Sequence, residues 1–497
     1  MRILNTIQIR ALDQYTIQHE PVASIDLMER ACKAFCSWFT GAIDPSETVG
    51  IICGTGNNGG DGLGIARLLA GWDYTVKVWI VRGGAPESED FALNLNRLPE
   101  RIVPVEISSS VNEDAFNDCT VLVDALFGSG LSRSLEGIYQ QVIECLNRSQ
   151  ALRIAVDIPS GLLADAPSSG SILRANHTVT FHAPKLAFLL AENVEYVGEW
   201  HVVDIGLSRE GAIAMETENF MLTRKSISRL IKPLHKFDHK GIRGKALLIA
   251  GSYGKMGAAV LAARGALRTG TGLLTVHVPQ CGYTILQSAV PEAMVSVDPS
   301  YACFTGAPLL QAFNAVGIGP GLGQDPDTLK ALRTMLENCN DAVVLDADAL
   351  NLIAANRELL HIIPPQSILT PHPGEFARLA GEWTNDFEKL EMQRAFAKAH
   401  QVNVVLKGAY TSIATPDGTI CFNNTGNPGM ATGGMGDILT GILTALLAQG
   451  YEPAEAARLG VWLHGMAGDA VARQQGIRGM TASDLIVQLN DCFRQLT

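Results

Sequence analysis

The sequence of 497 residues has few aromatic residues (6%), few charged residues (18%) and no excess of positive charge. Its formal net charge of −12 argues against a nucleic-acid-binding surface and against a polybasic patch for membranes. No uninterrupted apolar run reaches the length of a membrane-spanning helix, and the stretch 258–278 is broken by Arg264, Arg268 and several glycines. We therefore expect neither a nucleic-acid partner nor a membrane partner.

The ten cysteines show no metal-binding or redox pattern. No pair has C-x-x-C spacing, and no His–Cys cluster has the spacing of a zinc site. Cys32 and Cys36 lie one helical turn apart, which is more typical of core packing than of a metal site. Residues 1–6 lack the apolar segment of a secretory signal peptide. Reduced thiols and the expected lack of a signal peptide favour a cytoplasmic location.

What the sequence does contain is an alternation of short apolar runs with helical patterns, which predicts α/β domains with parallel sheets covered on both faces. The length exceeds one ordinary core. The expected strands are 49–53, 75–81, 121–125, 154–157, 178–181 and 201–205, then 245–250, 273–278, 315–318, 343–345, 402–406, 412–414 and 419–422. Periodicity weakens after Gly206, so we expect domains at 1–210 and 237–497, joined by a linker at 211–236.

The most informative segment is 427–437, in which four glycines precede Asp437 and an apolar helical segment follows. Glycines let backbone N–H groups converge, and a helix that begins there directs its positive end at the same point. Asp437 would then lie beside a bound anion, where it could take a proton from a hydroxyl that attacks a phosphoryl group. The alternative is a glycine-rich helix start with an ordinary capping aspartate.

A second glycine-rich segment follows the first expected strand. Gly54, Gly56 and Gly59 match the G-x-G-x-x-G spacing of dinucleotide-binding loops. The motif is weak alone, and the region about 20 residues later, where an acidic residue is expected, offers Lys77 and Arg82. The sequence therefore disfavours NAD-dependent redox chemistry but leaves phosphate binding open.

Polar residues end two further strands of the first half. Asp124 ends the strand at 121–125, and Asp157 and Ser160 lie at the end of the strand at 154–157. Because the carboxyl ends of parallel strands form the ligand crevice, Asn58, Asp124 and Ser160 could supply oxygen ligands to a cation. The Asp and Ser residues could instead cap the helices that follow.

Three motifs of the first half are similar to those of the YjeF N-terminal family, the NAD(P)H-hydrate epimerases: Asn57–Gly62, Asp124–Gly128 and Asp157–Gly161. The resemblance implies a Rossmann-like three-layer domain that interconverts the R and S forms of hydrated NAD(P)H. It implies a potassium ion held by Asn58, Asp124 and Ser160, with Asp157 as the acid/base candidate. The implied substrate contacts are Asn57, Asn58, Gly59, Gly60, Asp61, Gly128, Ser129, Gly130, Leu131, Ser132, Arg133, Ser134 and Asp157.

Glycines and polar residues again follow the expected strands of the second half, at 251–257, 317–323, 346–350, 370–375 and 407–411. Lys407 and the small residues after it suit a nucleotide phosphate or ribose. Taken alone, His372 is more typical of a structural loop histidine, and Asp346 and Asp348 could be helix caps. Their shared place at strand ends favours one site.

This half resembles the YjeF C-terminal family, the NAD(P)H-hydrate dehydratases of the ribokinase-like fold. The motifs that carry the resemblance are His239–Gly241, Gly251–Ser252, Gly319–Gly323, Asp346–Leu350, Thr370–Glu375, Lys407–Gly408 and Gly433–Asp437. The two resemblances together cover nearly the whole chain, and they identify it as a member of the bifunctional NAD(P)H-hydrate repair enzymes.

The second resemblance implies dehydration of the S-hydrate to NAD(P)H with ADP as co-substrate, together with Mg²⁺. Its implied hydrate contacts are Gly257 or Ala258, Gly321 or Gly323, His372 and Asp437. Its implied nucleotide contacts are Lys407, Gly408, Ala409, Tyr410, Thr411, Gly433, Gly434 and Gly436. We expect small-molecule partners and a homo-oligomer.

The residues fit a mechanism in which Asp437 takes the proton of the C6 hydroxyl. That oxygen attacks the terminal phosphoryl group of ADP, while backbone amides of 433–436 hold the developing charge. Phosphate then leaves far more readily than hydroxide, so elimination restores the dihydropyridine and releases AMP and phosphate.

Two alternatives belong to other functional classes. A small-molecule kinase is compatible with a ribokinase-like fold, because fold does not fix function. A non-catalytic nucleotide-binding or scaffold protein would gain nothing from the charge of Asp437. The sequence leaves open NADH against NADPH, ADP against ATP, and direct passage of substrate between the sites.

Overall fold

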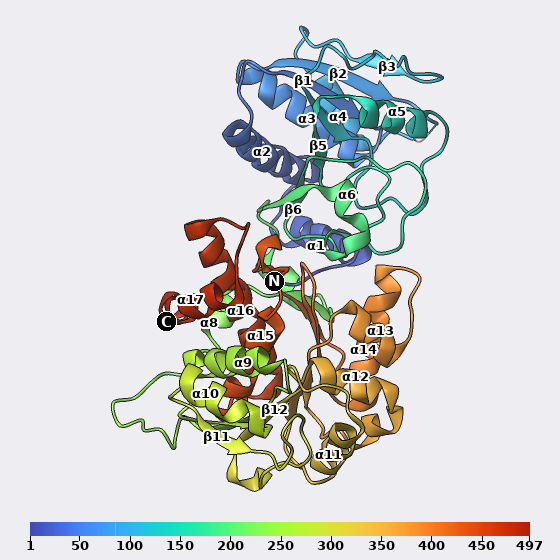
Figure 1. Cartoon of the computed structure of the whole chain (residues 1–497). Coiled ribbons are helices and arrows are strands. Elements are labelled where there is room, and N and C mark those ends of the chain that lie inside the picture. Colours follow the sequence, from blue (N-terminus) through green and yellow to red (C-terminus); the bar gives the residue numbers. More distant parts are fainter. Residues whose placement is uncertain (85) are drawn as a thin grey trace. The chain divides into compact units, whose positions relative to one another are not determined.

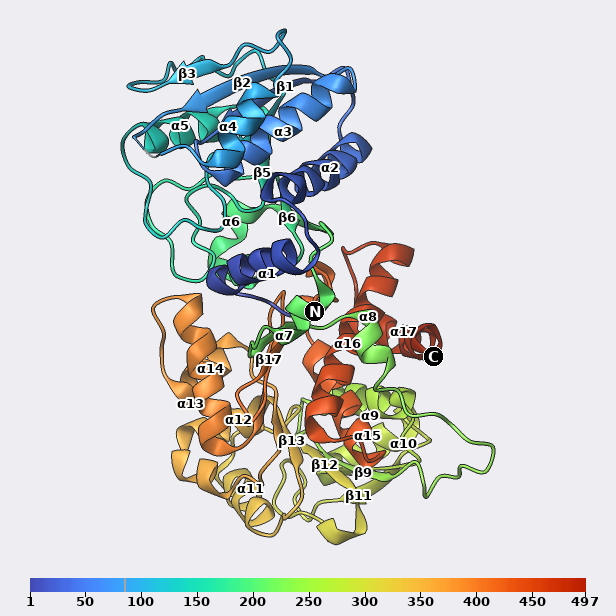
Figure 2. The same ribbon diagram turned by 180° about the vertical axis from the view of Figure 1, so that it is seen from behind.

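The computed structural model describes residues 1–84 and 86–497, which form two compact units. The first comprises Arg2–Thr217 with Asn385–Phe387, and the second comprises Met1, Glu218–Thr384 and Glu388–Thr497. Each unit is built on one sheet with helices on both faces, which confirms the expected α/β class (Figure 1, Figure 2).

The first unit has a sheet of seven parallel strands in the order β3-β2-β1-β4-β5-β6-β7. The strands are β1 (Thr48–Cys53), β2 (Thr75–Val81), β3 (Val105–Ile107), β4 (Val121–Ala125), β5 (Leu152–Val156), β6 (His177–Phe181) and β7 (Glu199–Val203). Its helices are α1 (Thr6–His19), α2 (Ser24–Ala42), α3 (Asn57–Gly71), α4 (Glu89–Asn96), α5 (Gly137–Arg148), α6 (Val194–Val197) and α7 (Arg209–Ala214).

Apolar strands pack on helices from both sides in this unit. One face carries α2 and α3, whose buried Phe35 and Leu63 share a core with Ile51 of β1. The other face carries α5, whose Val142 packs with Ile52 of the same strand. Alternate residues of β1 thus enter different cores, which explains its continuous apolar run. Cys32 and Cys36 are fully buried in the α2 core, as expected.

The second unit has a ten-stranded sheet in the order β11-β10-β9-β12-β13-β14-β15-β16-β17-β8. Its strands are β8 (Asn219–Met221), β9 (Lys245–Ile249), β10 (Leu273–Val278), β11 (Met294–Val297), β12 (Ala315–Ile318), β13 (Val343–Leu345), β14 (Ile368–Leu369), β15 (Asn403–Leu406), β16 (Ser412–Ala414) and β17 (Ile420–Phe422). The pairs from β11 to β15 are parallel, and β16 forms antiparallel pairs with β15 and β17.

Helices lie on both sides of this sheet as well (Figure 1, Figure 2). The helices of the unit are α8 (Arg224–Ser228), α9 (Met256–Thr269), α10 (Tyr283–Ala289), α11 (Pro326–Glu337), α12 (Ala347–Ala355), α13 (Pro373–Ala380), α14 (Asp386–His400), α15 (Met435–Ala448), α16 (Pro453–Gln475) and α17 (Ala482–Leu496). The largest core joins α9, α15, α16 and α17 to the sheet.

Most strands lie where the sequence predicts them, with instructive differences. Strand β5 ends at Val156, because Asp157 has a positive φ of 68° and leaves the extended conformation. Strand β7 begins two residues before the expected range, because Glu199 pairs with His177 directly after the turn at Gly198. Strands β3, β8, β11 and β14 have only two to four residues and carry no periodic signal.

The range 211–236, expected as a linker, contains α7, β8 and α8 in part or whole. Residues up to Thr217 cluster with the first unit and residues from Glu218 with the second. The domain limits 1–210 and 237–497 remain predictions.

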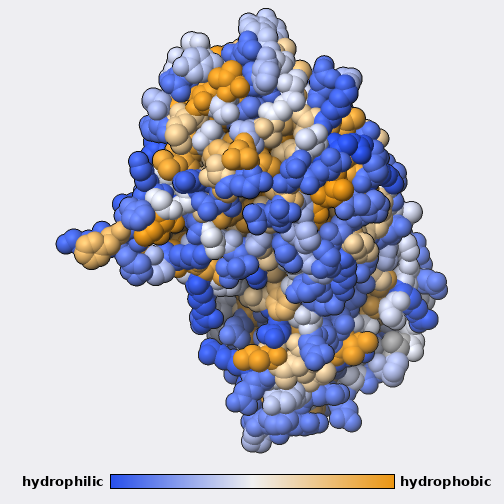
Figure 3. All heavy atoms as spheres, turned by 90° about the horizontal axis from the view of Figure 1, so that it is seen from below, coloured by the Kyte–Doolittle hydropathy of each residue, from blue (hydrophilic) through white to orange (hydrophobic). Residues whose placement is uncertain are grey.

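The molecular surface drawn in Figure 3 is mostly hydrophilic, with apolar side chains in small separate groups. No helix in the described part of the chain combines the length and the apolar character needed to cross a membrane.

Close packing of α9 on α15 sets the position of the glycine-rich segment before Asp437. A methyl group on Gly441 of α15 would lie 2.0 Å from the backbone oxygen of Ala262 in α9. A methyl group on Gly265 of α9 would lie 2.8 Å from the backbone oxygen of Ile438. Glycine is therefore required for the two backbones to approach this closely.

We expect Gly441→Ala to lower the free energy of unfolding of the second unit by about 1–3 kcal/mol, because the added methyl group forces α9 and α15 apart. Gly41→Ala in α2 is the control, since a methyl group there meets no atom within 4 Å and alanine favours a helix by about 1 kcal/mol. Urea unfolding followed by circular dichroism measures both variants. A Gly441→Ala midpoint equal to that of the unchanged chain would contradict the close contact.

Candidate active sites

A cavity of about 500 Å³ lies at the carboxyl edge of the first sheet. Its walls include loops after the neighbouring strands β1 and β4, where the strand order reverses, which is the usual ligand position in open α/β sheets. Among the sequence-predicted residues, the walls contain Asn57, Asn58, Asp61, Gly128, Ser129, Gly130, Leu131, Ser132, Arg133 and Asp157. The structure does not place Gly59, Gly60, Ser134, Asp124 or Ser160 in the cavity wall.

Gly59 has a packing role beside this cavity. It lies in the first turn of α3, and a methyl group there would fall 1.8 Å from the backbone oxygen of Gly54. The glycine therefore lets the helix begin against the end of β1, as the G-x-G-x-x-G spacing predicts.

Asp157 forms a buried ion pair with Lys185, which follows β6. The Asp157 carboxylate also accepts hydrogen bonds from the Thr180 hydroxyl and the Phe181 amide, each at 3.2 Å. The Lys185 ammonium also donates to the Thr180 hydroxyl at 2.8 Å. Asp157 is thus fixed in place with its charge compensated, and both side chains line the cavity.

Two further carboxyl groups line the cavity. Burial, with repulsion from Asp157, raises the pKa of Asp13 to about 6, although Lys185 acts in the opposite direction. Burial, followed by repulsion from Asp157 and Asp13, raises the pKa of Asp61 well above its ordinary range. Three carboxyl groups and one ammonium group therefore face the same space, so protons can be held and exchanged there near neutral pH.

Asp124 and Ser160 meet behind the cavity wall. The Asp124 carboxylate accepts from the Ser160 hydroxyl at 2.7 Å, from the Ser160 amide at 2.8 Å and from the Leu126 amide at 3.1 Å. Burial raises the pKa of Asp124 to about 6, although these hydrogen bonds lower it. No lysine or arginine within residues 1–84 and 86–497 acts on the charge of Asp124, so a bound cation would compensate it.

Asn58 supports the same interpretation. Its side-chain nitrogen is buried and has no hydrogen-bond partner in the described structure. A half-turn of the Asn58 amide exchanges its oxygen and its nitrogen. The amide oxygen would then occupy the buried position that has no hydrogen-bond partner. The structure brings Asp124 and Ser160 together and leaves the buried Asn58 amide available, so the predicted cation ligands Asn58, Asp124 and Ser160 stay a prediction that these observations support.

The helix-cap alternative for these residues is wrong. After β4 the next α-helix begins at Gly137 with Glu136 as its N-cap, and no α-helix starts directly after Asp157 or Ser160 in the described ranges. Asp124 and Ser160 instead bind each other, and Asp157 binds Lys185.

The second unit gathers its predicted residues at the carboxyl ends of β9, β12, β13, β14 and β15. At their centre is the buried Asp346, which accepts from the Thr370 hydroxyl at 2.7 Å, the Thr440 hydroxyl at 2.8 Å and the Lys407 ammonium at 3.0 Å. Asp346 occupies the N-cap position of α12, yet its side chain makes no capping bond. Its carboxylate instead ties three strand ends to α15.

Lys407 stands close to the first turn of α15. A methyl group on Gly436 would lie 3.5 Å from the Lys407 nitrogen and 3.7 Å from an Asp346 oxygen. Burial lowers the pKa of Lys407, but Asp346, Glu375 and Asp437 together raise it above its ordinary value. The ammonium group and the N-terminal amides of α15 thus offer hydrogen-bond donors suited to phosphate, with the three carboxylates beside them.

Asp437 is the third residue of α15, after an N-cap at Gly434 with a positive φ of 92°. Its carboxylate receives no hydrogen bond from any described residue, so it is not a capping aspartate. Burial is the main cause that raises the pKa of Asp437 to about 6, and repulsion from Asp346 and, more weakly, from Asp348 adds to it. Lys407 acts in the opposite direction and lowers this pKa. Asp437 is therefore a carboxylate poised to exchange a proton near neutral pH.

Asp348 binds two of the glycine-rich loops of this site, those that contain Gly323 and Lys255. Its carboxylate accepts from the Gly323 amide at 2.8 Å and pairs with Lys255 at 3.2 Å. Burial raises the pKa of Asp348, but the Gly323 amide and Lys255 outweigh this and lower it overall. Gly257 and Ala258 lie in the first turn of α9, and a methyl group on Gly321 would lie 3.0 Å from the Ala258 side chain.

His372 is exposed and is the N-cap of α13. Its Nδ1 accepts from the Glu375 amide at 3.2 Å, and Glu375 in return accepts from the His372 amide at 2.8 Å. The structural role expected of a loop histidine is therefore present, and its ring still faces solvent. The Thr411 hydroxyl closes the turn 408–411 by donating to the Gly408 carbonyl at 3.0 Å, next to Ala409 and Tyr410.

Sequence reasoning missed several residues of these sites. Lys185 lies in the loop four residues after the end of β6, so the strand-end rule that selected Asp157 could have found it. Asp13 lies on α1, which is far in sequence from the strand ends that surround the cavity, and no local motif marks it. Thr440 lies within an apolar helix, where its contact with Asp346 depends on the tertiary structure.

Comparison with known proteins matches both halves of the chain. A family model described as "NAD(P)H-hydrate dehydratase" matches residues 246–490, and one described as "YjeF-related protein N-terminus" matches residues 24–187. The chain is 36% identical over 516 residues to the bifunctional NAD(P)H-hydrate repair enzyme of Moorella thermoacetica, covering 100% of this chain and 97% of that protein.

Solved structures resemble the second unit. The ADP/ATP-dependent NAD(P)H-hydrate dehydratase of Bacillus subtilis, crystallised with ATP and Mg²⁺, is 31% identical with a TM-score of 0.50, over 56% of this chain and 99% of that chain. A ribokinase-like superfamily protein of Enterococcus faecalis is 25% identical with a TM-score of 0.51, over 57% of this chain and 98% of that chain. The expected ribokinase-like fold is confirmed.

The buried ion pair gives a test of the first site. We expect Lys185→Met to destabilise the first unit by about 3–5 kcal/mol, because it leaves the Asp157 carboxylate buried without its cation. Adding Asp157→Asn should recover part of that loss. Thermal unfolding of the two single variants and the double variant measures the coupling. A double variant no more stable than Lys185→Met would show that the two side chains are not coupled.

Proposed function

The chain belongs to the family of bifunctional NAD(P)H-hydrate repair enzymes, and from this premise we propose which residues carry each of its two activities. It has an epimerase domain and a nucleotide-dependent dehydratase domain that act on hydrated NAD(P)H. The small-molecule kinase alternative does not account for the full-length match to repair enzymes. The assignment of sites and steps below is the proposal.

The dehydratase assignment rests on one observation: the Asp437 carboxylate has no hydrogen-bond partner in the described structure and lies at the N-terminal turn of α15 beside Lys407. We assign Asp437 as the base that takes the proton of the C6 hydroxyl of the S-hydrate. The freed oxygen attacks the terminal phosphoryl group of ADP, and the P–O bond to AMP breaks. Lys407 and the amides of 433–436 stabilise the charge on the transferred group.

Elimination completes the reaction. The C6–O bond breaks with loss of phosphate, and a proton leaves the adjacent ring carbon, which restores the dihydropyridine. The hydrate would contact Gly257 or Ala258, Gly321 or Gly323, and His372. The nucleotide would contact Lys407–Thr411, Gly433, Gly434 and Gly436. We propose that this nucleotide is ADP and not ATP.

Mg²⁺ fits this site because the lysines that pair with its four carboxylates (Asp346, Asp348, Glu375 and Asp437) are, among the described residues, Lys407 and Lys255, so negative charge is in excess. Asp346 and Glu375, which flank Lys407, would hold it with the phosphates, and it would supply further charge neutralisation.

For the epimerase, we propose that Asp157 relays a proton as the C6–O bond opens and closes again. Lys185 keeps Asp157 in place and compensates its charge. The 57–61 and 128–134 loops would hold the substrate. Asn58, Asp124 and Ser160 would hold K⁺, which would neutralise the buried Asp124 and fix both loops. We also propose a homo-oligomer located in the cytoplasm.

Separate active sites predict separable losses. Asp437→Asn should lower the dehydration rate by at least about 1,000-fold, because a general base within a phosphoryl-transfer site is removed, and it should leave epimerisation unchanged. Asp157→Asn is the matched control and should show the opposite pattern. Epimer ratios by chromatography and reduced nicotinamide by absorbance measure the two rates. Equal loss of both activities in either variant would contradict two sites.

The pKa of Asp437 predicts the pH profile of dehydration. A base acts only when ionised, so kcat/KM should fall with decreasing pH below about pH 6 and level off above it. Asp348→Asn should move this midpoint to lower pH, because it removes a charge that raises the pKa of Asp437. Initial rates at saturating nucleotide measure both profiles. A flat profile through this range would contradict the assignment of Asp437.

Potassium removal tests the cation site. Added K⁺ should raise the unfolding midpoint of the first unit relative to Li⁺, because an ion that binds the folded state stabilises it. Asp124→Asn should lose this effect. Asp118→Asn, on an exposed aspartate paired with Lys77, should keep it. Equal K⁺ stabilisation of both variants would place the ion elsewhere.

A further inference from the structure

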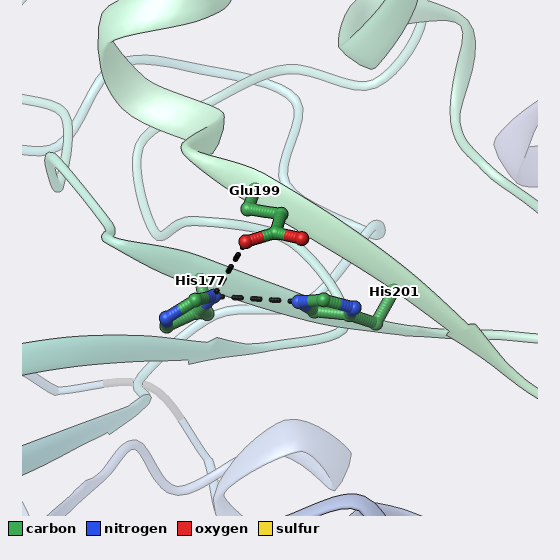
Figure 4. Close-up of side chains that lie close together, drawn as sticks. All are labelled: His177, Glu199 and His201. Atoms are coloured by element: carbon green, nitrogen blue, oxygen red, sulfur yellow. Dashed lines mark hydrogen bonds and ion pairs between the residues drawn. The ribbon is translucent and has the colours of Figure 1, made fainter. Parts of the chain in front are cut away.

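Three metal-ligating side chains come together on β6 and β7, at a place that neither proposed reaction uses (Figure 4). His177 begins β6, and Glu199 and His201 lie on β7. Their ligand atoms all lie within 4.8 Å of one another. The closest pair is Nε2 of His201 and Nδ1 of His177 at 3.3 Å, and an oxygen of Glu199 lies 3.8 Å from Nδ1 of His177.

The strand register produces this cluster. His177 pairs with Glu199, and Val179 pairs with His201, so the three side chains lie on the same face of the sheet. The α2 helix covers this face, and the ring of Trp38 lies 4.7 Å from the ring of His201 and 5.6 Å from that of His177. Trp38 therefore restricts both imidazole rings.

The cluster is separate from the epimerase cavity. The cavity is lined by Phe181 and His182, at the carboxyl end of β6, whereas His177 is the first residue of that strand. Four residue steps along a strand span about 13 Å. The cluster and the cavity thus lie toward opposite edges of the sheet, so a ligand at one does not occupy the other.

The spacing of the nitrogen atoms matches a tetrahedral metal centre. Two imidazole nitrogens, each about 2.0–2.1 Å from one Zn²⁺ at a tetrahedral angle, lie about 3.3 Å apart, the separation observed here. The Glu199 oxygen lies 3.8 Å from the His177 nitrogen and within 4.8 Å of the His201 nitrogen, and the first of these distances exceeds the tetrahedral separation of about 3.3 Å. Binding therefore requires this exposed side chain to move toward the two imidazoles.

We propose that His177, Glu199 and His201 form a binding site for a divalent transition metal of the Zn²⁺ type. Two imidazoles with one carboxylate suit Zn²⁺ and exclude Mg²⁺ and Ca²⁺, which prefer oxygen ligands. The alternative is a hydrogen bond between the two imidazoles together with a cross-strand ion pair of Glu199 with a protonated His177. The two interpretations differ in whether the three groups bind Zn²⁺.

Binding there would fasten an edge strand. Among the described strands, β7 lies at the edge of the sheet and pairs with β6 alone, and an edge strand has ladder bonds on one side where a central strand has them on two. A metal coordinated by one residue of β6 and two of β7 would link the strands side chain to side chain, so it should stabilise the first unit.

The test titrates the full chain with Zn²⁺ against a chelating dye, with K⁺ and Mg²⁺ present to occupy the oxygen sites. We expect one Zn²⁺ per chain in the unchanged protein, at least about 10-fold weaker binding in Glu199→Gln, and loss of that site in His201→Gln. His361→Gln is the matched control, because His361 also lies near a second histidine, His400, with ring centres 6.4 Å apart, and should bind like the unchanged chain.

Two further readouts distinguish this site from adventitious binding to thiols. Cu²⁺ bound beside Trp38 should quench part of the tryptophan fluorescence, and Trp38→Phe should remove that part. Zn²⁺ should raise the unfolding midpoint of the first unit in His361→Gln but not in His201→Gln. Equal Zn²⁺ affinity in His201→Gln and His361→Gln would overturn the proposal, and epimerase activity of His201→Gln would show that it is folded.

Discussion

The reversal of strand order beside β1 in the first sheet and beside β9 in the second is the constraint on which both sites depend. At β1 and β4, and again at β9 and β12, chain connections run to opposite faces, so the loops at the carboxyl ends separate and leave room for a ligand. Glycine is required where backbone meets backbone in this region. A methyl group on Gly54 would lie 2.1 Å from the Leu126 backbone oxygen, and one on Gly319 would lie 1.8 Å from that of Asp346.

Each site then places a lysine against a buried aspartate, with different consequences, and the lysine is fully buried in the first site and partly exposed in the second. Lys185 pairs with the proposed acid/base residue, Asp157, and so limits its movement. Lys407 pairs instead with Asp346, a neighbour of the proposed base, and leaves Asp437 without a hydrogen bond among the described residues. The first arrangement suits a reversible proton relay within a lined cavity. The second keeps a carboxylate of raised pKa next to a helix N-terminus that attracts phosphate.

Strands with continuous apolar runs, such as β1 and β4, could be predicted because both of their faces are buried. Short strands such as β3 and β14 could not, because two or three residues carry no period. Local motifs located Asn58, Asp124 and Asp437, since glycine-rich turns and strand ends leave a sequence signal. The contributions of Asp13, Lys185 and Thr440 depend on side chains that meet only after the chain has folded.

The helix-cap alternative also shows that the sequence alone does not reveal which groups a side chain binds in the folded protein. From the sequence, Asp124, Asp346 and Asp437 could each cap a helix. In the structure none of them makes a capping bond, and Asp124 and Asp346 bind other side chains instead. Buried carboxylates held by partners from other strands are costly unless they are needed. Their presence at both carboxyl edges is therefore the physical signature of function in this chain.

The central claim is that one chain converts both epimers of hydrated NAD(P)H through two sites. The most direct measurement supplies an equal mixture of the R and S hydrates with ADP and follows reduced nicotinamide by absorbance. We expect complete recovery with the unchanged chain and a halt near half recovery with Asp157→Asn, because the R form can no longer enter the dehydratase. Complete recovery at the normal rate with Asp157→Asn, or a halt at half with the unchanged chain, would contradict it.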